Sequence, residues 1–404
     1  MPAAEEPAPV VEARAPAKRW PKVAAAIACG LAVLFFLAAR IRPTPLMIAA
    51  YSNEYGEALA LLDAGADVNA KTLLGMTALA ATERAGNSGI SFFLLEKGAQ
   101  DDPAVVLGWT PLMISIWRGS RADTENLLSK GADVNARGKA GETALMAAAR
   151  KGAEEDAAGL LAKGADANAA SSNGRTALME AAFKGHAAVA QVLLDKGADV
   201  DMISASGWTA LGQASAEGNK DVVDVLLAKG AKANASRGGE MVPLLYASSG
   251  RHTEVVKALL DKGADPNVTR GSDGGSPLIF ASQQGDADAA EALLAHGALP
   301  DARYYDGRTP LHFAAANGSV GVIDLLLSKG ADVNARMQGG RTALMLAASA
   351  GETSTVNDLI ARGADVNART ERGATAISIA RHRGHGDVVE ALKRAGANTG
   401  PQDE

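Results

Sequence analysis

The sequence predicts an all-α solenoid in which short helical repeats stack on one another. The first observation is a 33-residue period that runs from Thr44 to the end of the chain. The residues that open the units are Thr44, Thr77, Thr110, Thr143, Thr176, Thr209, Val242, Ser276, Thr309, Thr342 and Thr375. Their spacing is 33 at every step except the step of 34 between Val242 and Ser276. Self-similarity at this period is typical of repeat proteins, whose units bury their apolar faces against their neighbours.

The second observation is a glycine at the same place in every unit. These glycines are Gly65, Gly98, Gly131, Gly164, Gly197, Gly230, Gly263, Gly297, Gly330, Gly363 and Gly396. Glycine adopts the left-handed backbone conformation that ends many helices. Most of the 44 glycines of the chain therefore lie at the ends of helices and in turns, and the high glycine content does not indicate disorder.

The N-terminal region differs in composition from the repeats. Residues 1–22 are rich in Ala, Pro and Glu, and we expect them to be disordered. Residues 23–39 contain no charged side chain, and this length lies at the lower limit for a transmembrane helix. We expect an uncleaved signal anchor because Leu37 disfavours cleavage after Ala39. The alternative is a cleaved signal peptide and a secreted protein.

Flanking charges predict the orientation of this segment. Four basic residues precede it between positions 14 and 22, and two follow at positions 40 and 42. The excess on the N-terminal side places the repeats on the extracytoplasmic side, which is the periplasm in a bacterium. The Ala-rich, Cys-poor composition favours a bacterial source. Cys29 is the only cysteine, so no disulfide links the repeats.

The unit from Asn173 to Asp201 illustrates the elements of one repeat. Thr176 is placed to cap a short helix that begins at Ala177 and is broken at Lys184 and Gly185. A second helix runs from about Ala187 to Lys196, and the chain then returns through an extended hairpin turn. Residues 44–399 are thus expected to form helix–turn–helix units with β-hairpin fingers, followed by a polar tail at 400–404.

These units resemble the ankyrin repeat. Thr309-Pro310-Leu311-His312 matches the opening motif of that family, and Gly65-Ala66-Asp67-Val68-Asn69 matches its closing motif. The resemblance covers residues 44–399 of the 404. It implies a scaffold that binds protein partners through the finger tips and the exposed edge of the first helix of each repeat.

The pattern changes near the seventh and eighth repeats. Val242 cannot provide a side-chain cap, Arg251 stands where most repeats have glycine, and the following finger contains one inserted residue between Arg270 and Gly275. We expect a weak point here, because the stability of a solenoid depends on interfaces between neighbouring repeats.

No residue pattern predicts catalysis or a cofactor. His186, His252 and His385 fall in the turn between the two helices and His312 in the opening motif, which are structural positions in the ankyrin family. The spacing of His382 and His385 provides only two candidate metal ligands, so no metal site is expected. Nucleophile–base pairs and glycine-rich phosphate loops are also absent from the sequence.

The predicted binding surface combines the residue before each opening position with the pair before the mid-turn glycine. Its candidate partner-binding residues are Met76, Arg84, Trp109, Trp117, Arg118, Arg150, Lys151, Arg175, Phe183, Lys184, Trp208, Tyr304, Tyr305 and Arg308. Three of the four tryptophans fall in this set. Trp and Arg dominate interaction hot spots.

The clustered cations indicate a protein partner with an acidic or mixed segment. The alternative is a receptor for an anionic polymer or small ligand in the cell envelope. Nucleic acid is disfavoured by the net charge of −6 and by the predicted topology.

Overall fold

The computed structural model describes residues 43–72, 76–85, 88–100, 107–235 and 241–398. Three predicted parts of the chain lie outside these residues: the disordered segment 1–22, the membrane segment 23–39 and the tail 400–404. Among the residues that are described, no helix has the length and apolar character needed to span a bilayer.

The chain divides into two units. The first comprises the residues up to Ile114 together with Arg137–Glu142, and the second comprises Ser115–Ala136 and the residues from Thr143 onward. The helices of the first unit are α2 (Pro45–Tyr51), α3 (Tyr55–Asp63), α4 (Ala78–Ala85) and α5 (Ser88–Glu96), and α7 (Pro111–Arg118) contains the boundary between the units.

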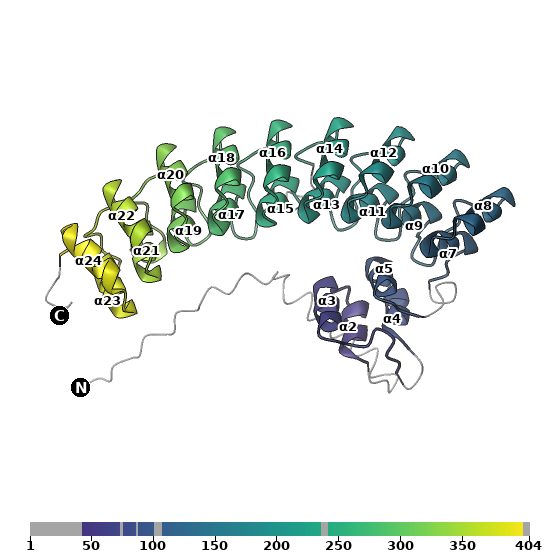
Figure 1. Ribbon diagram of the computed structural model, residues 1–404, viewed down its shortest axis with the longest axis horizontal. Helices are drawn as coiled ribbons and strands as arrows, with labels where there is room; N and C mark the ends of the chain where they lie inside the picture. The colour runs from purple at the N-terminus through teal and green to yellow at the C-terminus, as the bar shows by residue number, and fades with distance from the viewer. Residues whose placement is uncertain (1–42, 73–75, 86–87, 101–106, 236–240, 399–404) are drawn as a thin grey trace. The chain divides into compact units, whose positions relative to one another are not determined.

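The second unit is a stack of helix pairs in two rows (Figure 1). The first helices of the repeats are α9 (Ala144–Lys151), α11 (Ala177–Lys184), α13 (Ala210–Glu217), α15 (Pro243–Ser249), α17 (Pro277–Gln284), α19 (Pro310–Ala316), α21 (Ala343–Ala350) and α23 (Ala376–Arg383). The second helices are α8 (Arg121–Ser129), α10 (Glu154–Ala162), α12 (Ala187–Asp195), α14 (Lys220–Ala228), α16 (Thr253–Asp261), α18 (Ala287–Ala295), α20 (Val320–Ser328), α22 (Thr353–Ala361) and α24 (Gly386–Arg394). A short 3-10 turn, η1, spans Gln338–Gly340.

The opening residues cap the first helices as predicted. Thr176 Oγ1 accepts from the backbone N–H of Met179 at 3.3 Å, and Thr209 Oγ1 accepts from that of Gly212 at 3.0 Å. Val242 makes no side-chain cap, which confirms the sequence prediction. Its side chain is buried instead in a small apolar cluster with those of Leu245 and Phe280.

The predicted β-hairpin fingers are wrong in one respect, because the described fingers are turns without strands. Their β-type pairing is limited to two isolated bridges, Ala170–Thr176 and Arg270–Gly275. Several fingers close with a single backbone bond of their own, such as that from the N–H of Ser204 to the carbonyl of Trp208 at 2.9 Å, and also bond to an adjacent finger. The N–H of Tyr305, for example, donates to the carbonyl of Asp273 at 2.9 Å.

A ladder of side-chain hydrogen bonds joins consecutive repeats at the turn between the helices. In each case the residue before the second helix donates to a carbonyl near the end of the first helix in the preceding repeat. The bonds run from His186 to Arg150 O (3.2 Å), Asn219 to Ala182 O (2.9 Å), His252 to Ala216 O (3.1 Å) and His385 to Ser349 O (3.1 Å). We call this set the turn ladder. It confirms the structural role predicted for these histidines.

An asparagine clamp joins the repeats on their finger side. Asn135 Nδ2 donates to the carbonyl of Gly164 at 3.0 Å, and its Oδ1 accepts from the N–H of Asp166 at 2.8 Å. The same pair of bonds recurs at Asn69, Asn168, Asn234, Asn267, Asn334 and Asn367. Aspartate takes this place at positions 201 and 301 and can only accept.

The mid-turn glycine allows the turn ladder to form. Gly218 has a φ of 73°, and a Cβ added to it would lie 2.4 Å from His252 Nδ1. At the corresponding place one repeat later, Arg251 adopts a φ of 62°. A non-glycine residue is strained in this left-handed conformation, which agrees with the weak point predicted here.

We predict that Gly218→Ala destabilises the protein more than Gly230→Ala. Both glycines have a left-handed φ, but a Cβ on Gly230 would meet nothing within 4 Å. Gly230→Ala should lower the free energy of unfolding by about 1 kcal/mol through backbone strain alone. Gly218→Ala should lower it by about 3 kcal/mol, because His252 must also move and lose its bond. Urea denaturation followed by circular dichroism measures both values, and equal losses would contradict the ladder's role.

Candidate protein-interaction surface

The first helices of the second unit carry a group of aromatic and basic side chains on successive repeats. We call Trp117, Lys151, Arg175, Phe183, Lys184, Trp208 and Tyr246 the inner surface. Lys151 is exposed and the other six are half-buried. Each residue precedes an opening position or lies in the first helix that follows one.

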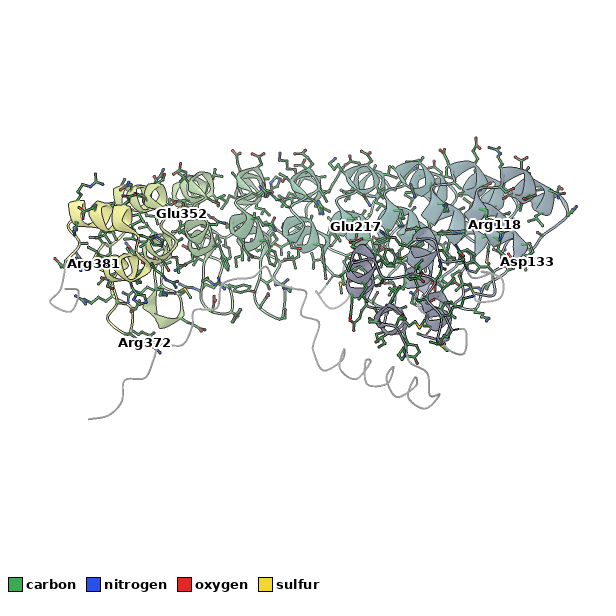
Figure 2. The ribbon with its side chains drawn as sticks, turned by 60° about the horizontal axis from the view of Figure 1, so that its bottom comes forward. Arg118, Asp133, Glu217, Glu352, Arg372 and Arg381 are labelled. Atoms are coloured by element: carbon green, nitrogen blue, oxygen red, sulfur yellow. The ribbon has the colours of Figure 1, made fainter. Side chains whose placement is uncertain are left out.

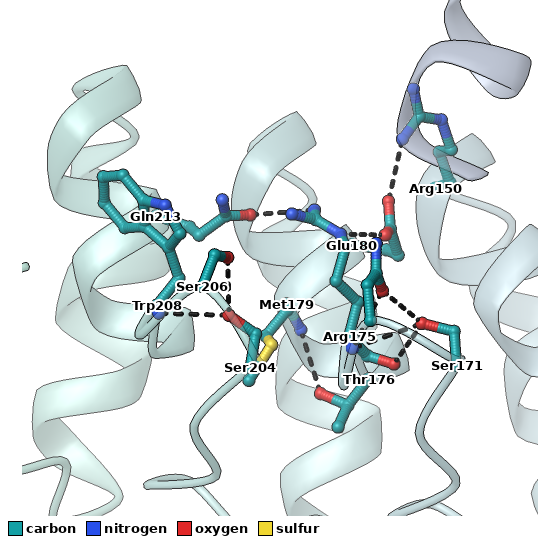
Figure 3. A network of polar contacts seen from close by, with 11 residues as sticks. Arg150, Ser171, Arg175, Thr176, Met179, Glu180, Ser204, Ser206, Trp208 and Gln213 are labelled. Carbon is teal, nitrogen blue, oxygen red and sulfur yellow. Dashed lines mark hydrogen bonds and ion pairs between the residues drawn. The ribbon is translucent and has the colours of Figure 1, made fainter. Parts of the chain in front are cut away.

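A buried carboxylate organises the centre of the inner surface (Figure 3). Glu180 accepts from Arg150 Nη1 at 2.8 Å and from Arg175 Nε at 2.5 Å. Arg175 Nη2 also reaches the next repeat and donates to Gln213 Oε1 at 2.8 Å. This network links three consecutive repeats through side chains alone.

The pKa of Glu180 reflects this environment. Burial alone would raise the pKa of this carboxyl, but the guanidinium groups of Arg175 and Arg150 outweigh burial and lower the pKa to about 2. The carboxylate is therefore ionised at neutral pH, and with two arginines the group carries a net positive charge.

Cations surround the aromatic rings of the inner surface. The ring of Phe183 lies 5.8 Å from Arg150 Cζ, 5.7 Å from Arg175 Cζ and 5.5 Å from Lys184 Nζ. Lys151 Nζ lies 4.8 Å from the ring of Trp117. These separations are within the range of cation–π attraction. The cations consequently hold the rings at defined positions.

Trp208 and Tyr246 form an aromatic pair between two successive repeats. Their ring centroids are 4.6 Å apart, and the Tyr246 hydroxyl donates to Met241 Sδ at 3.0 Å. Because both rings are half-buried, each packs on the protein and also has an accessible part.

A second aromatic group lies on the finger before α19. Tyr304 packs against Tyr305 at 4.8 Å and edge-on against Phe313 at 5.6 Å, while Arg308 Cζ is 4.3 Å from the Phe313 ring. The Tyr304 hydroxyl donates to Asp273 Oδ2 at 2.9 Å. Burial and this bond raise the pKa of Tyr304. Tyr305 is 66% exposed.

The structure buries two residues that the sequence analysis assigns to the binding surface. Trp109 and Arg150 are each 3% exposed, so neither side chain is accessible to a partner. Trp109 and the half-buried Met76 belong to the first unit, and the side chain of Arg84 lies outside the described part of the structure. Arg118 is exposed at the end of α7 (Figure 2).

Sequence reasoning did not identify the residues four places after the opening position. These are Glu180, Gln213, Tyr246, Phe280 and Phe313 in five consecutive repeats. The signal was present, since the same place holds Ala, Ile or Leu in the other repeats. Residues that the repeat does not require recur there. Glu180, Gln213 and Tyr246 contact or belong to the inner surface, whereas Phe313 belongs to the second aromatic group.

No metal site is apparent in the described ranges. They contain no group of three or more His, Cys, Asp or Glu side chains placed to hold a metal ion. His312 is buried, its Nε2 donates to the carbonyl of Arg341 at 3.2 Å, and its Nδ1 accepts from the N–H of Thr309. Burial lowers the pKa of His312, so a neutral imidazole fills this position.

The repeated caps, glycines and turn ladder agree with the comparison against known families. A family model described as "Ankyrin repeats (3 copies)" matches residues 46–138, 109–171, 125–204, 145–237, 197–270, 244–337 and 335–403. The chain belongs to the ankyrin repeat family. Ankyrin repeats suggest a protein–protein interaction scaffold and are typically not enzymes.

Other comparisons place this ankyrin repeat protein among solved structures. It is similar to the human ASB11 ankyrin repeat domain, with 32% sequence identity and a TM-score of 0.49. The match covers 55% of this chain and 99% of that one. A search of curated proteins finds no match.

We predict that Glu180 makes the stability of the ankyrin repeats sensitive to acid. Its pKa in the folded state lies below the usual glutamate value of 4.5, so its contribution is present above about pH 4.5 and is lost as the pH falls toward 2. The shift corresponds to about 3 kcal/mol. Glu180→Gln should remove this part of the pH dependence of unfolding, measured by urea denaturation at several pH values. An unchanged pH profile in the variant would contradict the assignment.

Proposed function

We propose that this ankyrin repeat protein is a scaffold that binds a protein partner through its inner surface. The observation that carries the proposal is a set of half-buried aromatic rings at places where the repeat needs only small side chains. The position of Phe183 tolerates a small side chain, because it holds Ala216, Ser249, Ala316 and Ser349 in four of the other repeats. Large aromatic side chains with an accessible part are typical of interaction hot spots.

The charge of the inner surface favours a partner with an acidic or mixed segment. Lys151 is exposed, Lys184 is half-buried, and the group of Arg150, Glu180 and Arg175 adds one net positive charge. Positive charge beside apolar rings attracts carboxylates and lets the rings bury apolar groups of the same segment.

Photo-crosslinking tests this surface. We predict that a photo-reactive residue at exposed Ser249, one turn after Tyr246 on α15, yields a discrete protein adduct in cells of the source organism. The matched control at exposed Ala228, on α14 in the row of second helices, should yield none. Adding Trp208→Ala and Lys184→Ala should reduce the Ser249 adduct about tenfold, because each change removes about 1 kcal/mol or less of binding. Adducts of equal yield at both positions would refute the proposal.

The proposed scaffold is also anchored in a membrane. The support is the uncharged stretch 23–39 with four basic residues before it and two after it. Such a stretch would hold the repeats close to the bilayer, on the extracytoplasmic side.

We predict that the full-length chain stays with membranes after alkaline extraction and that a chain without residues 23–39 does not. Protease added to cells whose outer membrane is permeabilised and whose inner membrane is intact should digest the repeats of the full-length chain. Extraction of the full-length chain into the soluble fraction would contradict the anchor, and repeats that resist protease until the membrane is lysed would contradict the orientation.

A further inference from the structure

Three arginines occupy the same place on three consecutive fingers of the second unit. Arg303, Arg336 and Arg369 each lie six residues before an opening position, and all three are exposed. We call them the arginine ladder. Arg270 has the same place on the preceding finger, but it pairs with Asp273.

Backbone carbonyls hold the guanidinium groups of the arginine ladder. Arg303 Nη1 donates to the carbonyl of Gly307 at 3.2 Å and to that of Arg336 at 3.1 Å. Arg336 Nη2 donates to the carbonyl of Arg369 at 2.8 Å. These bonds fix the side chains between fingers but leave their charge uncompensated. Of the ion pairs formed among the described residues, none includes a member of the ladder.

Arginines outnumber carboxylates on the three fingers of the ladder, although Glu371 lies two residues after Arg369. The finger at 333–341 carries Arg336 and Arg341 and no carboxylate. Asp306 on the preceding finger already pairs with Arg308 at 2.7 Å. Arg372 and Arg381 lie at the C-terminal end of the unit (Figure 2). This accumulation contrasts with the net charge of −6 for the whole chain.

The spacing of the ladder indicates the conformation of its ligand. Stacked helices are about 10 Å apart, so equivalent side chains of consecutive repeats have nearly the same separation. A polyproline II segment has three residues per turn and advances about 3.1 Å per residue, so every third side chain returns to the same face after about 9.3 Å. A β-strand repeats its face every two residues, or about 6.7 Å, and does not match.

An aromatic pair stands at the N-terminal end of the ladder. Tyr305 follows Arg303 by two residues, packs against Tyr304 at 4.8 Å and is 66% exposed. Proline-rich segments in the polyproline II conformation dock on aromatic side chains. An α-helix also brings residues seven apart to a spacing of about 10.5 Å, but the aromatic pair favours the proline-rich segment.

We infer that the arginine ladder binds an extended, proline-containing acidic segment of a partner protein, with a carboxylate at every third residue. Each carboxylate meets one guanidinium, and the prolines beside the carboxylate at Arg303 pack on Tyr305. The inference goes beyond the proposed function, because the ladder lies on the fingers before Thr309, Thr342 and Thr375 and shares no residue with the inner surface. A negative result for the arginine ladder therefore leaves the inner surface unaffected, and a negative result for the inner surface leaves the ladder unaffected.

Fluorescence anisotropy with labelled synthetic peptides tests the inference on the full-length chain. A peptide of five Glu-Pro-Pro units should bind more tightly than a peptide of the same composition with its glutamates contiguous. A Lys-Pro-Pro peptide should not bind. This comparison uses the unaltered protein, so it does not depend on the folding of any variant.

Variants then locate the site. The triple change Arg303→Gln, Arg336→Gln and Arg369→Gln should weaken binding of the Glu-Pro-Pro peptide about tenfold, since each exposed charge pair contributes a factor of about two. The matched control is Lys196→Gln, Lys262→Gln and Lys329→Gln, which removes three exposed charges beside the second helices and should change affinity less than about twofold.

Three results would overturn the inference. The first is an equal loss of affinity for the Glu-Pro-Pro peptide in the arginine and lysine triple variants. The second is equal affinity for the periodic and contiguous peptides or for dextran sulfate, which would indicate a nonspecific polyanion site. The third is tighter binding of an alanine-based helical peptide with a glutamate at every seventh position.

Discussion

The hydrogen bond from a side chain of one repeat to a backbone carbonyl of the preceding repeat is the interaction on which the second unit depends. Its helices are only seven to nine residues long, and such helices are marginal in isolation. Each also leaves its last carbonyls without partners inside the helix. The turn ladder supplies donors to carbonyls near these ends. On the finger side the asparagine clamp donates in the opposite direction, to a carbonyl of the following repeat. A repeat is therefore completed only by its neighbour.

This constraint also determines where function can reside. The ladder requires a donor such as His252 and, opposite it, the absence of a side chain at Gly218. Places that face neither the ladder nor the apolar core are left to vary. They include the residue before the opening position and the last turn of the first helix, where Trp208 and Phe183 lie. Because Arg175 contacts Glu180 in its own repeat and Gln213 in the next, the resulting surface is shared between repeats.

The sequence predicted the features that recur in every repeat, because periodicity displays them many times. Helix caps such as Thr176, the structural histidines and the irregularity at Val242 were all identified in this way. The burial of Arg150 was not, because it depends on a carboxylate 30 residues away, and the period does not specify which variable residues meet. The fingers were predicted as hairpins for a similar reason. Their extended residues are evident in the sequence, but pairing with the adjacent finger is a tertiary property.

The buried group of Arg150, Glu180 and Arg175 illustrates how the stack trades stability for a defined surface. Removing charges from water has a cost that mutual attraction offsets only partly, so such groups are weak evidence for stability. The guanidiniums of Arg175 and Arg150 outweigh the effect of burial and lower the pKa of Glu180 to about 2, and one positive charge remains. That charge is fixed beside the ring of Phe183, which lies within 6 Å of both arginines. An aliphatic core at this place would leave the inner surface without a positioned cation, and the cation is what a carboxylate-bearing partner would recognise.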